Sequence, residues 1–121
     1  MATTEAEQIV NRFVAAWERA DVDELLDYFA EDAVWHPMPM KPVVGKAALR
    51  EAISEWLGAT APRVGEIHLQ VSDGRIVMHE RTDHAFGARK HVSPVCAVFE
   101  IDNGRITAWR EYFDMSPFAR P

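Results

Sequence analysis

Residues 92–114, VSPVCAVFEIDNGRITAWREYFD, decide the fold, because Asn103-Gly104 separates two runs rich in β-branched and aromatic residues. An Asn-Gly pair between such runs is a strong β-hairpin signal. The same pattern occurs upstream in residues 64–86, VGEIHLQVSDGRIVMHERTDHAF, with Asp73-Gly74 at the turn. Residues 87–90 link the two hairpins, so the second half of the chain predicts a four-stranded antiparallel meander.

Helical periodicity dominates the residues that precede these strands. Apolar side chains recur at three- and four-residue steps over Ile9–Ala20, which indicates one buried helix face. We expect a short helix near Val22–Phe29 and a third helix over Lys46–Leu57, ended by Gly58 as its cap. A brief strand is expected at Ala33–His36, and the proline-rich stretch after it predicts a loop.

Three N-terminal helices on one face of a mainly antiparallel sheet define an α+β fold. If the sheet is long and curved, the helices complete a cone around one pocket. A length of 121 residues fits a single domain over residues 1–121, with no room for a separate cofactor domain.

Composition narrows the partners. The formal charge of −6 argues against nucleic acid and anionic membranes, which both need a basic surface. A small molecule is the better expectation. The chain has one cysteine, Cys96, so it can form no internal disulfide and fits a reducing compartment. The first residues lack the basic and apolar regions of a signal peptide, so we expect a cytoplasmic protein.

Charged residues within the strands are the first candidates for a functional site. Strand alternation places Arg81 and Asp83 on one face, with His79 before them, and Asp114 closes the last apolar run. In one interpretation, Arg81 and Asp83 form a surface ion pair and Asp114 caps a strand end. In the other, all three meet inside the pocket, where one guanidinium bridges two carboxylates of different protonation state.

Several runs resemble one known family. The chain is similar to the limonene-epoxide hydrolases, which have the cone-shaped NTF2-like fold shared with ketosteroid isomerase and SnoaL-type polyketide cyclases. The resemblance is carried by Glu80-Arg81-Thr82-Asp83, Pro94-Val95-Cys96-Ala97-Val98-Phe99-Glu100-Ile101, Asn103-Gly104-Arg105-Ile106 and Trp109-Arg110-Glu111-Tyr112-Phe113-Asp114.

The resemblance implies opening of a small apolar epoxide by water, without a cofactor or metal. Asp114 would take a proton from water, Asp83 would give a proton to the epoxide oxygen, and Arg81 would bridge both carboxylates. If Asp114 points inward, Trp109 and Phe113 point to the outer sheet face. Such an apolar face needs a covering partner, and proteins of the resembled family are commonly dimers through it, so the resemblance implies a homodimer.

The first strand departs from the family pattern. The family holds its water with a tyrosine and an asparagine two residues apart, and Trp35 and Pro37 stand there in this chain. An indole offers one donor and a proline side chain offers none, so the water would be poorly aimed. His36 lies between them and would substitute only if the loop breaks the strand alternation.

This departure leaves alternatives open: a cyclase or isomerase acting on a ketone or polyketide-like substrate, or a non-catalytic small-molecule-binding protein. Five histidines lack metal-ligand spacing, so we expect no metal site. The candidate substrate-binding residues are Trp35, His36, Met38, Met40 and His79.

Overall fold

The computed structural model describes residues 4–116, which form three α-helices, a 3-10 turn and six strands. In chain order these are α1 (Glu5–Ala16), η1 (Trp17–Arg19), α2 (Val22–Leu26), β1 (Phe29–Met38), β2 (Val43–Val44), α3 (Lys46–Thr60), β3 (Arg63–Ser72), β4 (Ile76–Ala85), β5 (His91–Asp102) and β6 (Arg105–Phe113).

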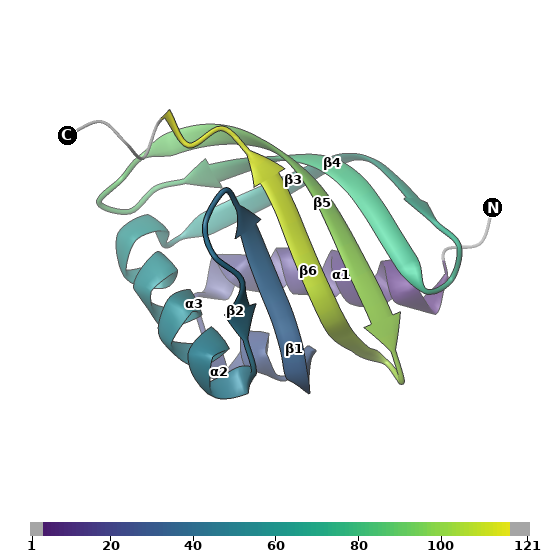
Figure 1. Cartoon of the computed structure of the whole chain (residues 1–121). Helices are drawn as coiled ribbons and strands as arrows, with labels where there is room; N and C mark the ends of the chain where they lie inside the picture. Colours follow the sequence, from purple (N-terminus) through teal and green to yellow (C-terminus); the bar gives the residue numbers. More distant parts are fainter. Residues whose placement is uncertain (1–3, 117–121) are drawn as a thin grey trace.

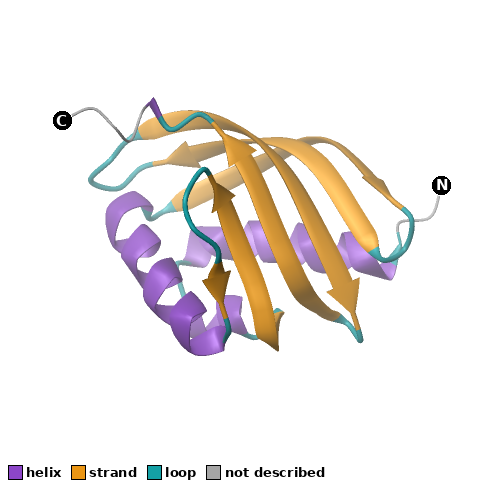
Figure 2. Cartoon of the chain, in the orientation of Figure 1, coloured by secondary structure: helices purple, strands orange, loops and turns teal. Residues whose placement is uncertain are grey.

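One curved sheet carries the fold, with strand order β2-β1-β6-β5-β4-β3 (Figure 1). Only the pair of β1 and β6 is parallel among these described strands; the other pairs are antiparallel. The helices lie together on one side of the sheet, and the strands bend over them (Figure 2). The predicted α+β architecture of three helices on a mainly antiparallel sheet is therefore confirmed.

Several element boundaries differ from the expectation: α2 ends at Leu26, β1 already begins at Phe29, and Val43–Val44 form a short strand in the expected loop. Helix α3 runs through Gly58 to Thr60, because the N–H of Ala61 still reaches the carbonyl of Leu57 and closes the last turn at 3.0 Å. Strand β1 continues through Pro37 to Met38. Proline is tolerated there because β2 covers only the earlier part of β1, so the strand has one free edge among the described residues.

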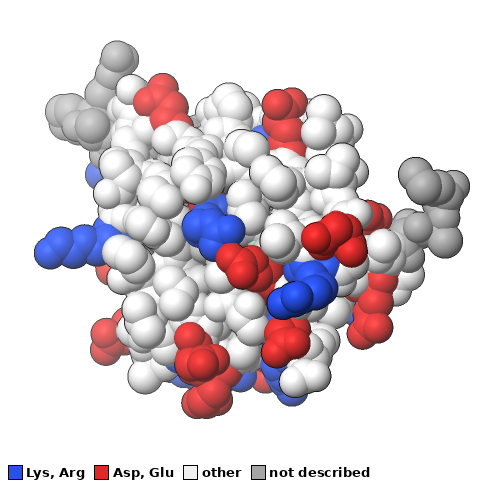
Figure 3. All heavy atoms as spheres, turned by 45° about the vertical axis from the view of Figure 1, so that its right-hand side comes forward, with Lys and Arg blue, Asp and Glu red and all other residues white. Residues whose placement is uncertain are grey.

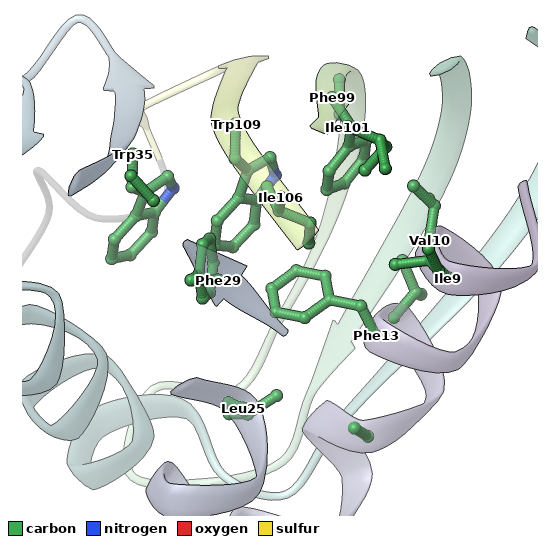
Figure 4. Packing of buried hydrophobic residues seen from close by; sticks show 14 of the residues in the cluster. Ile9, Val10, Phe13, Leu25, Phe29, Trp35, Phe99, Ile101, Ile106 and Trp109 are labelled. Atoms are coloured by element: carbon green, nitrogen blue, oxygen red, sulfur yellow. The ribbon is translucent and has the colours of Figure 1, made fainter. Parts of the chain in front are cut away.

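An aromatic cluster forms the core between α1 and the sheet (Figure 4). Phe13 meets Trp109 edge-on with ring centroids 4.9 Å apart, and Trp109 stacks on Trp35 at 4.8 Å. Edge and offset contacts of this kind add to the apolar area that the rings bury. Trp35, Phe99 and Trp109 join β1, β5 and β6 to this cluster, so the inner faces of these three strands are held together.

The alternation of β6 is the reverse of the expectation. Trp109 is buried, Phe113 packs against the core, and Glu111 between them also faces inward. The prediction that Trp109 and Phe113 lie on the outer face is wrong, because strand side chains at i and i+2 share a face and Glu111, not Asp114, takes the inner one.

Candidate functional site

Arg81 lies at the centre of a buried polar cluster beneath the curved sheet. Its Nε donates to Asp83 Oδ1 at 2.8 Å and its Nη2 to Asp83 Oδ2 at 3.1 Å. The same Nη2 donates to Glu111 Oε2. Arg81, Asp83 and Glu111 are only 4, 3 and 4% exposed. One guanidinium therefore bridges two carboxylates inside the protein, as predicted in kind but with a different second carboxylate.

Strand register brings these groups together. His79, Arg81 and Asp83 occupy alternate positions on β4, so all three side chains face the helices. Glu111 reaches them from β6, although β5 lies between β4 and β6. Trp35 on β1 donates its Nε1–H to Glu111 Oε1 at 3.2 Å. Both oxygens of Glu111 thus accept hydrogen bonds from fixed donors.

Asp114 does not join the cluster. It follows the end of β6 and is exposed, and its carboxylate accepts hydrogen bonds from N and Oγ of Ser116 at 2.9 and 2.7 Å. The prediction that Asp114 enters the pocket is wrong, because Asp114 has the parity of the exposed Tyr112. The plainer interpretation, a carboxylate that caps a strand end, describes it.

His79 contacts Arg81 and connects it to Gln70. Its Nε2 lies 3.0 Å from Arg81 Nη1, and its Nδ1 lies 2.9 Å from Gln70 Oε1. Because Arg81 is a donor and the Gln70 oxygen an acceptor, the imidazole is neutral with its proton on Nδ1. Burial, reinforced by the positive charge of Arg81, lowers the pKa of His79 to about 3. Gln70 in turn donates to Asn11 Oδ1 on α1 at 3.0 Å.

A second arginine, Arg63 at the start of β3, also faces the cluster. Its Nη2 lies 3.7 Å from Asp83 Oδ2, and its guanidinium carbon lies over the ring of Trp17 at 5.6 Å and over that of Trp56 at 5.5 Å. Burial would raise the pKa of Asp83, but the charges of Arg81 and Arg63 outweigh burial and lower this pKa below its usual value. Two guanidiniums therefore balance two carboxylates.

Several hollows adjoin the cluster, and one of about 10 Å³ lies against Arg63, Gly65, Arg81 and Asp83 on the side of α1. A second cavity of about 10 Å³ is enclosed by Asp83, Glu111, Arg63 and Ser93, with Trp35, Trp56, Val95 and Phe113 completing its wall. A wider groove of about 430 Å³ lies next to it, and its lining includes Met40, Val43, Ala52 and Met115. Trp35 and Trp56 line both the second cavity and the groove, so their rings separate the groove from the carboxylates.

The predicted substrate-binding residues divide between these places. Trp35 and Met40 line the groove. His36 and Met38 are half-buried and alternate with Trp35 along β1, so they lie on the opposite face of the strand. The strand is regular at His36, so the loop does not turn this side chain toward the water position. His79 supports Arg81.

Sequence reasoning missed Glu111, Arg63 and Ser93. Glu111 could have been found from strand alternation: it lies two residues after the apolar Trp109 on the last strand, so the two side chains share a face. No signal marked Arg63 or Ser93, because their position depends on how β3 and β5 pair with β4. Gly65 leaves room for the cluster, since a Cβ there would lie 2.6 Å from Val14 and 3.3 Å from Asp83 Oδ1.

Within residues 4–116, no group of three or more His, Cys, Asp or Glu side chains is arranged to hold a metal ion. None of the helices in that range is long and apolar enough to cross a membrane.

The curved sheet, its three covering helices and the buried charged cluster define a member of the cone-shaped NTF2-like class. Residues 4–119 match the family model of the limonene-1,2-epoxide hydrolase catalytic domain. The chain belongs to this family. It is 34% identical over 107 residues to epoxide hydrolase EphG of Mycobacterium tuberculosis, which covers 88% of this chain and 71% of that protein.

Solved structures agree with this assignment. An LEH-like epoxide hydrolase of M. tuberculosis matches 92% of this chain and 84% of its own, with a TM-score of 0.81 and 31% identity. The epoxide hydrolase/cyclase-like enzyme SalBIII, which has a role in pyran ring formation in the polyether salinomycin, matches 92% of each chain at a TM-score of 0.78. Its 21% identity shows a shared fold.

Proposed function

We propose that this protein hydrolyses a small, largely apolar epoxide to a diol, without a cofactor. The observation that carries the proposal is the buried bridge from Arg81 to Asp83 and Glu111. Family membership supports the reaction class, because the matched model describes an epoxide hydrolase domain.

Glu111 is the general base in this proposal, in place of Asp114. Its carboxylate lines the cavity of about 10 Å³, which is about the space of one water molecule. Glu111 takes a proton from water while the water oxygen attacks an epoxide carbon. The C–O bond to that carbon breaks, its electron pair stays on the epoxide oxygen, and that oxygen then takes up the proton, which completes the diol.

Trp35 and Arg81 orient the base. Each donates to a different oxygen of Glu111, so the carboxylate cannot rotate without losing a buried hydrogen bond. Pro37 lies opposite Glu111 in the register of β1 and β6 and offers no side-chain hydrogen bond to water. In this proposal the fixed carboxylate of Glu111 helps to aim the water, a role that the family gives to two water-binding side chains.

Asp83 is the second carboxylate of the bridge. Burial would raise the pKa of this carboxylate, but the charges of Arg81 and Arg63 outweigh burial and lower it. Asp83 holds the two guanidiniums in place, one through hydrogen bonds and the other through an ion pair.

The substrate class follows from the groove. Met40, Val43, Ala52 and Trp56 give it a mainly apolar wall, and its volume of about 430 Å³ suits a molecule of modest size. Lys41, Glu55, Thr60 and Arg89 also line the groove and offer polar atoms to a ligand.

The test compares Glu111→Gln with Asp114→Asn in diol formation from a panel of small epoxides that includes limonene 1,2-epoxide. Glu111→Gln removes the base and keeps the shape, so we expect turnover to fall at least a hundredfold. Asp114→Asn changes an exposed carboxylate and should stay within about threefold of the parent. Circular dichroism and thermal unfolding show whether both variants are folded.

Two outcomes would sink the proposal: a folded parent protein that hydrolyses no epoxide of the panel, or a Glu111→Gln variant as active as its parent. If instead Asp114→Asn is the inactive variant, the assignment of the base is wrong while the reaction class stands.

A cyclase or isomerase is the second candidate, and Pro37 favours it. Proton transfer to and from a bound substrate, or attack by the substrate's own hydroxyl, requires no held water. SalBIII, of similar fold, is described as epoxide hydrolase/cyclase-like. This candidate predicts ring closure of an epoxy-alcohol, or solvent deuterium exchange beside a ketone, lost in Glu111→Gln. Tight ligand binding that survives loss of both carboxylates would point to a non-catalytic binding protein.

A further inference from the structure

We propose that the hydroxyl of Ser93 holds the attacking water in the cavity beside Glu111, by accepting a hydrogen bond from the O–H that Glu111 does not deprotonate. This inference rests on the proposed function, because it completes the water site of the same reaction.

The position of Ser93 is the first argument. Ser93 lies on β5 and is 2% exposed. It pairs with Asp83 in the register of β4 and β5, so the two side chains share the inner face of the sheet. Ser93 lines the same cavity of about 10 Å³ as Glu111. One water fills a space of this size, so a water that contacts the base also lies close to Ser93.

The hydroxyl itself is the second argument. Ser93 Oγ is buried and has no hydrogen-bond partner in residues 4–116. A buried polar atom without a partner costs stability, and an ordered water is a common partner for such an atom. Because a hydroxyl both donates and accepts, it can turn to suit a water held by a neighbouring carboxylate.

The chemistry of the attack calls for an acceptor in this cavity. Glu111 takes one proton of the water, and a lone pair of the water oxygen must point at the epoxide carbon. The remaining O–H fixes the orientation of the water only if it has an acceptor of its own. A donor would compete with the epoxide carbon for the lone pair, so the group that aims the water must accept.

Ser93 is the acceptor that suits this need. The other side chains of the cavity, apart from the two carboxylates, either carry no polar atom or can only donate: Val95, Phe113, Arg63, Trp35 and Trp56. Both oxygens of Asp83 already accept from Arg81. The oxygen of Ser93 is used by no hydrogen bond within the described residues.

This role of Ser93 also accounts for the departure on the first strand. Trp35 donates its N–H to Glu111, and Pro37 has no polar side-chain atom. Neither side chain can therefore accept a hydrogen bond from water. In this proposal β5 supplies, through Ser93, the acceptor that β1 lacks.

The kinetic test uses Ser93→Ala, with Ser54→Ala as a matched control. Both variants lose one hydroxyl oxygen, but Ser54 is exposed on α3 and does not line the groove. A poorly aimed reactant costs about tenfold to a hundredfold in rate. We expect this loss in kcat for Ser93→Ala, with KM within about threefold of the parent because the hydroxyl contacts water and not substrate. Ser54→Ala should keep both values.

The site of attack separates a water-holding hydroxyl from one that only packs. Turnover in H₂¹⁸O labels the carbon that the water attacks, so the test uses an unsymmetrical epoxide that the parent opens mainly at one carbon. A water without its second contact reaches both carbons, so Ser93→Ala should label a mixture. If Ser93→Ala keeps the labelling pattern of the parent, the proposal is overturned.

A second measurement does not depend on turnover or on folding of a variant. In a high-resolution crystal structure of the parent protein, we expect an ordered water within hydrogen-bond distance, about 2.5–3.2 Å, of both Ser93 Oγ and the Glu111 carboxylate. A cavity without a water, or a water that contacts Glu111 but not Ser93, would overturn the proposal.

These results distinguish the two proposals. If a water bridges Ser93 and Glu111 while no epoxide is hydrolysed, the water site stands and the failure belongs to the hydrolase assignment alone. If Glu111→Gln is inactive while Ser93→Ala matches its parent in kcat and labelling, the hydrolase stands and the role of Ser93 is wrong.

Discussion

Three positions separate Glu111 from Asp114, and this separation decides which of the two carboxylates faces Arg81. Residues an odd number apart on a strand point to opposite faces, so both cannot lie inside. The sequence predicts that Arg81 and Asp83 share a face because they are two apart on one strand. It does not tell which of Glu111 and Asp114 faces them, because each has one aromatic neighbour in the sequence.

The pH dependence of stability provides a test of His79. Its pKa is about 3 in the folded protein and 6.5 as a reference for the unfolded chain. Between these values the unfolded chain binds a proton that the folded protein excludes, so the free energy of unfolding falls as pH falls. Each excluded proton contributes a slope of up to about 1.4 kcal/mol per pH unit.

His79→Gln removes this slope, because an amide can accept from Arg81 and donate to Gln70 without titrating. Urea unfolding of both proteins at pH 7, 6, 5 and 4 measures the difference. We expect the variant to lose less stability than the parent between pH 6 and 4, although Asp83, whose pKa is also lowered, still destabilises both proteins in acid. Parallel curves for the two proteins would contradict the neutral, buried imidazole.

At the scale of elements, the hairpins and helices were predictable from local patterns, whereas the register in which the strands pair was not. Asn103-Gly104 and Asp73-Gly74 mark turns within the local sequence, and both form as expected. The pairing of β3 with β4 contains an irregularity between Ile67 and Leu69, which changes the parity along β3. This is why Arg63, at the other end of that strand, carried no readable sign that it faces Asp83.

Trp56 on helix α3 separates the groove from the cavity, so its substitution tests how the substrate reaches the cluster. Trp56→Ala should join the two hollows and admit bulkier epoxides, so kcat/KM should rise for a bulky epoxide relative to a small one. Trp56 is half-buried, and its loss should lower the free energy of unfolding by about 2 kcal/mol. Competition assays with paired epoxides and urea unfolding check the two effects.

Leu57→Ala, one position along the same half-buried part of α3, is the control for a general loss of packing. An unchanged preference between bulky and small epoxides in Trp56→Ala would show that the substrate does not pass between Trp35 and Trp56.

At the scale of the whole molecule, the outer face of the sheet has no helix over it in the described structure (Figure 1). Met78 and Tyr112 are 44 and 46% exposed there, and Cys96 between their strands is exposed as well. The side of the molecule in Figure 3 carries both signs of charge with uncharged surface between them. The exposed side chains of Met78, Tyr112 and Val92 are suited to contact a second copy of the chain.

We therefore propose a homodimer through the outer sheet face, and Tyr112→Asp tests it. Burying a carboxylate in an apolar interface is costly, so this variant should be monomeric at micromolar concentration, where the parent sediments as a dimer. Val44→Asp, on the edge strand β2, is the exposed control and should remain dimeric. A thiol reagent should modify Cys96 faster in the Tyr112→Asp monomer, and a monomeric parent would contradict the proposal.

The chain of contacts from Asn11 through Gln70 and His79 to Arg81 links the first helix to the charged cluster. Each link has one direction of donation, so loss of the Asn11 oxygen would leave the Gln70 amide without that acceptor. Asn11 is exposed on α1, more than fifty residues away in sequence from every other member of this chain of contacts. Asn11 therefore supports the cluster from the protein surface: a substitution there can change how firmly Arg81 is held without altering any residue that lines the groove.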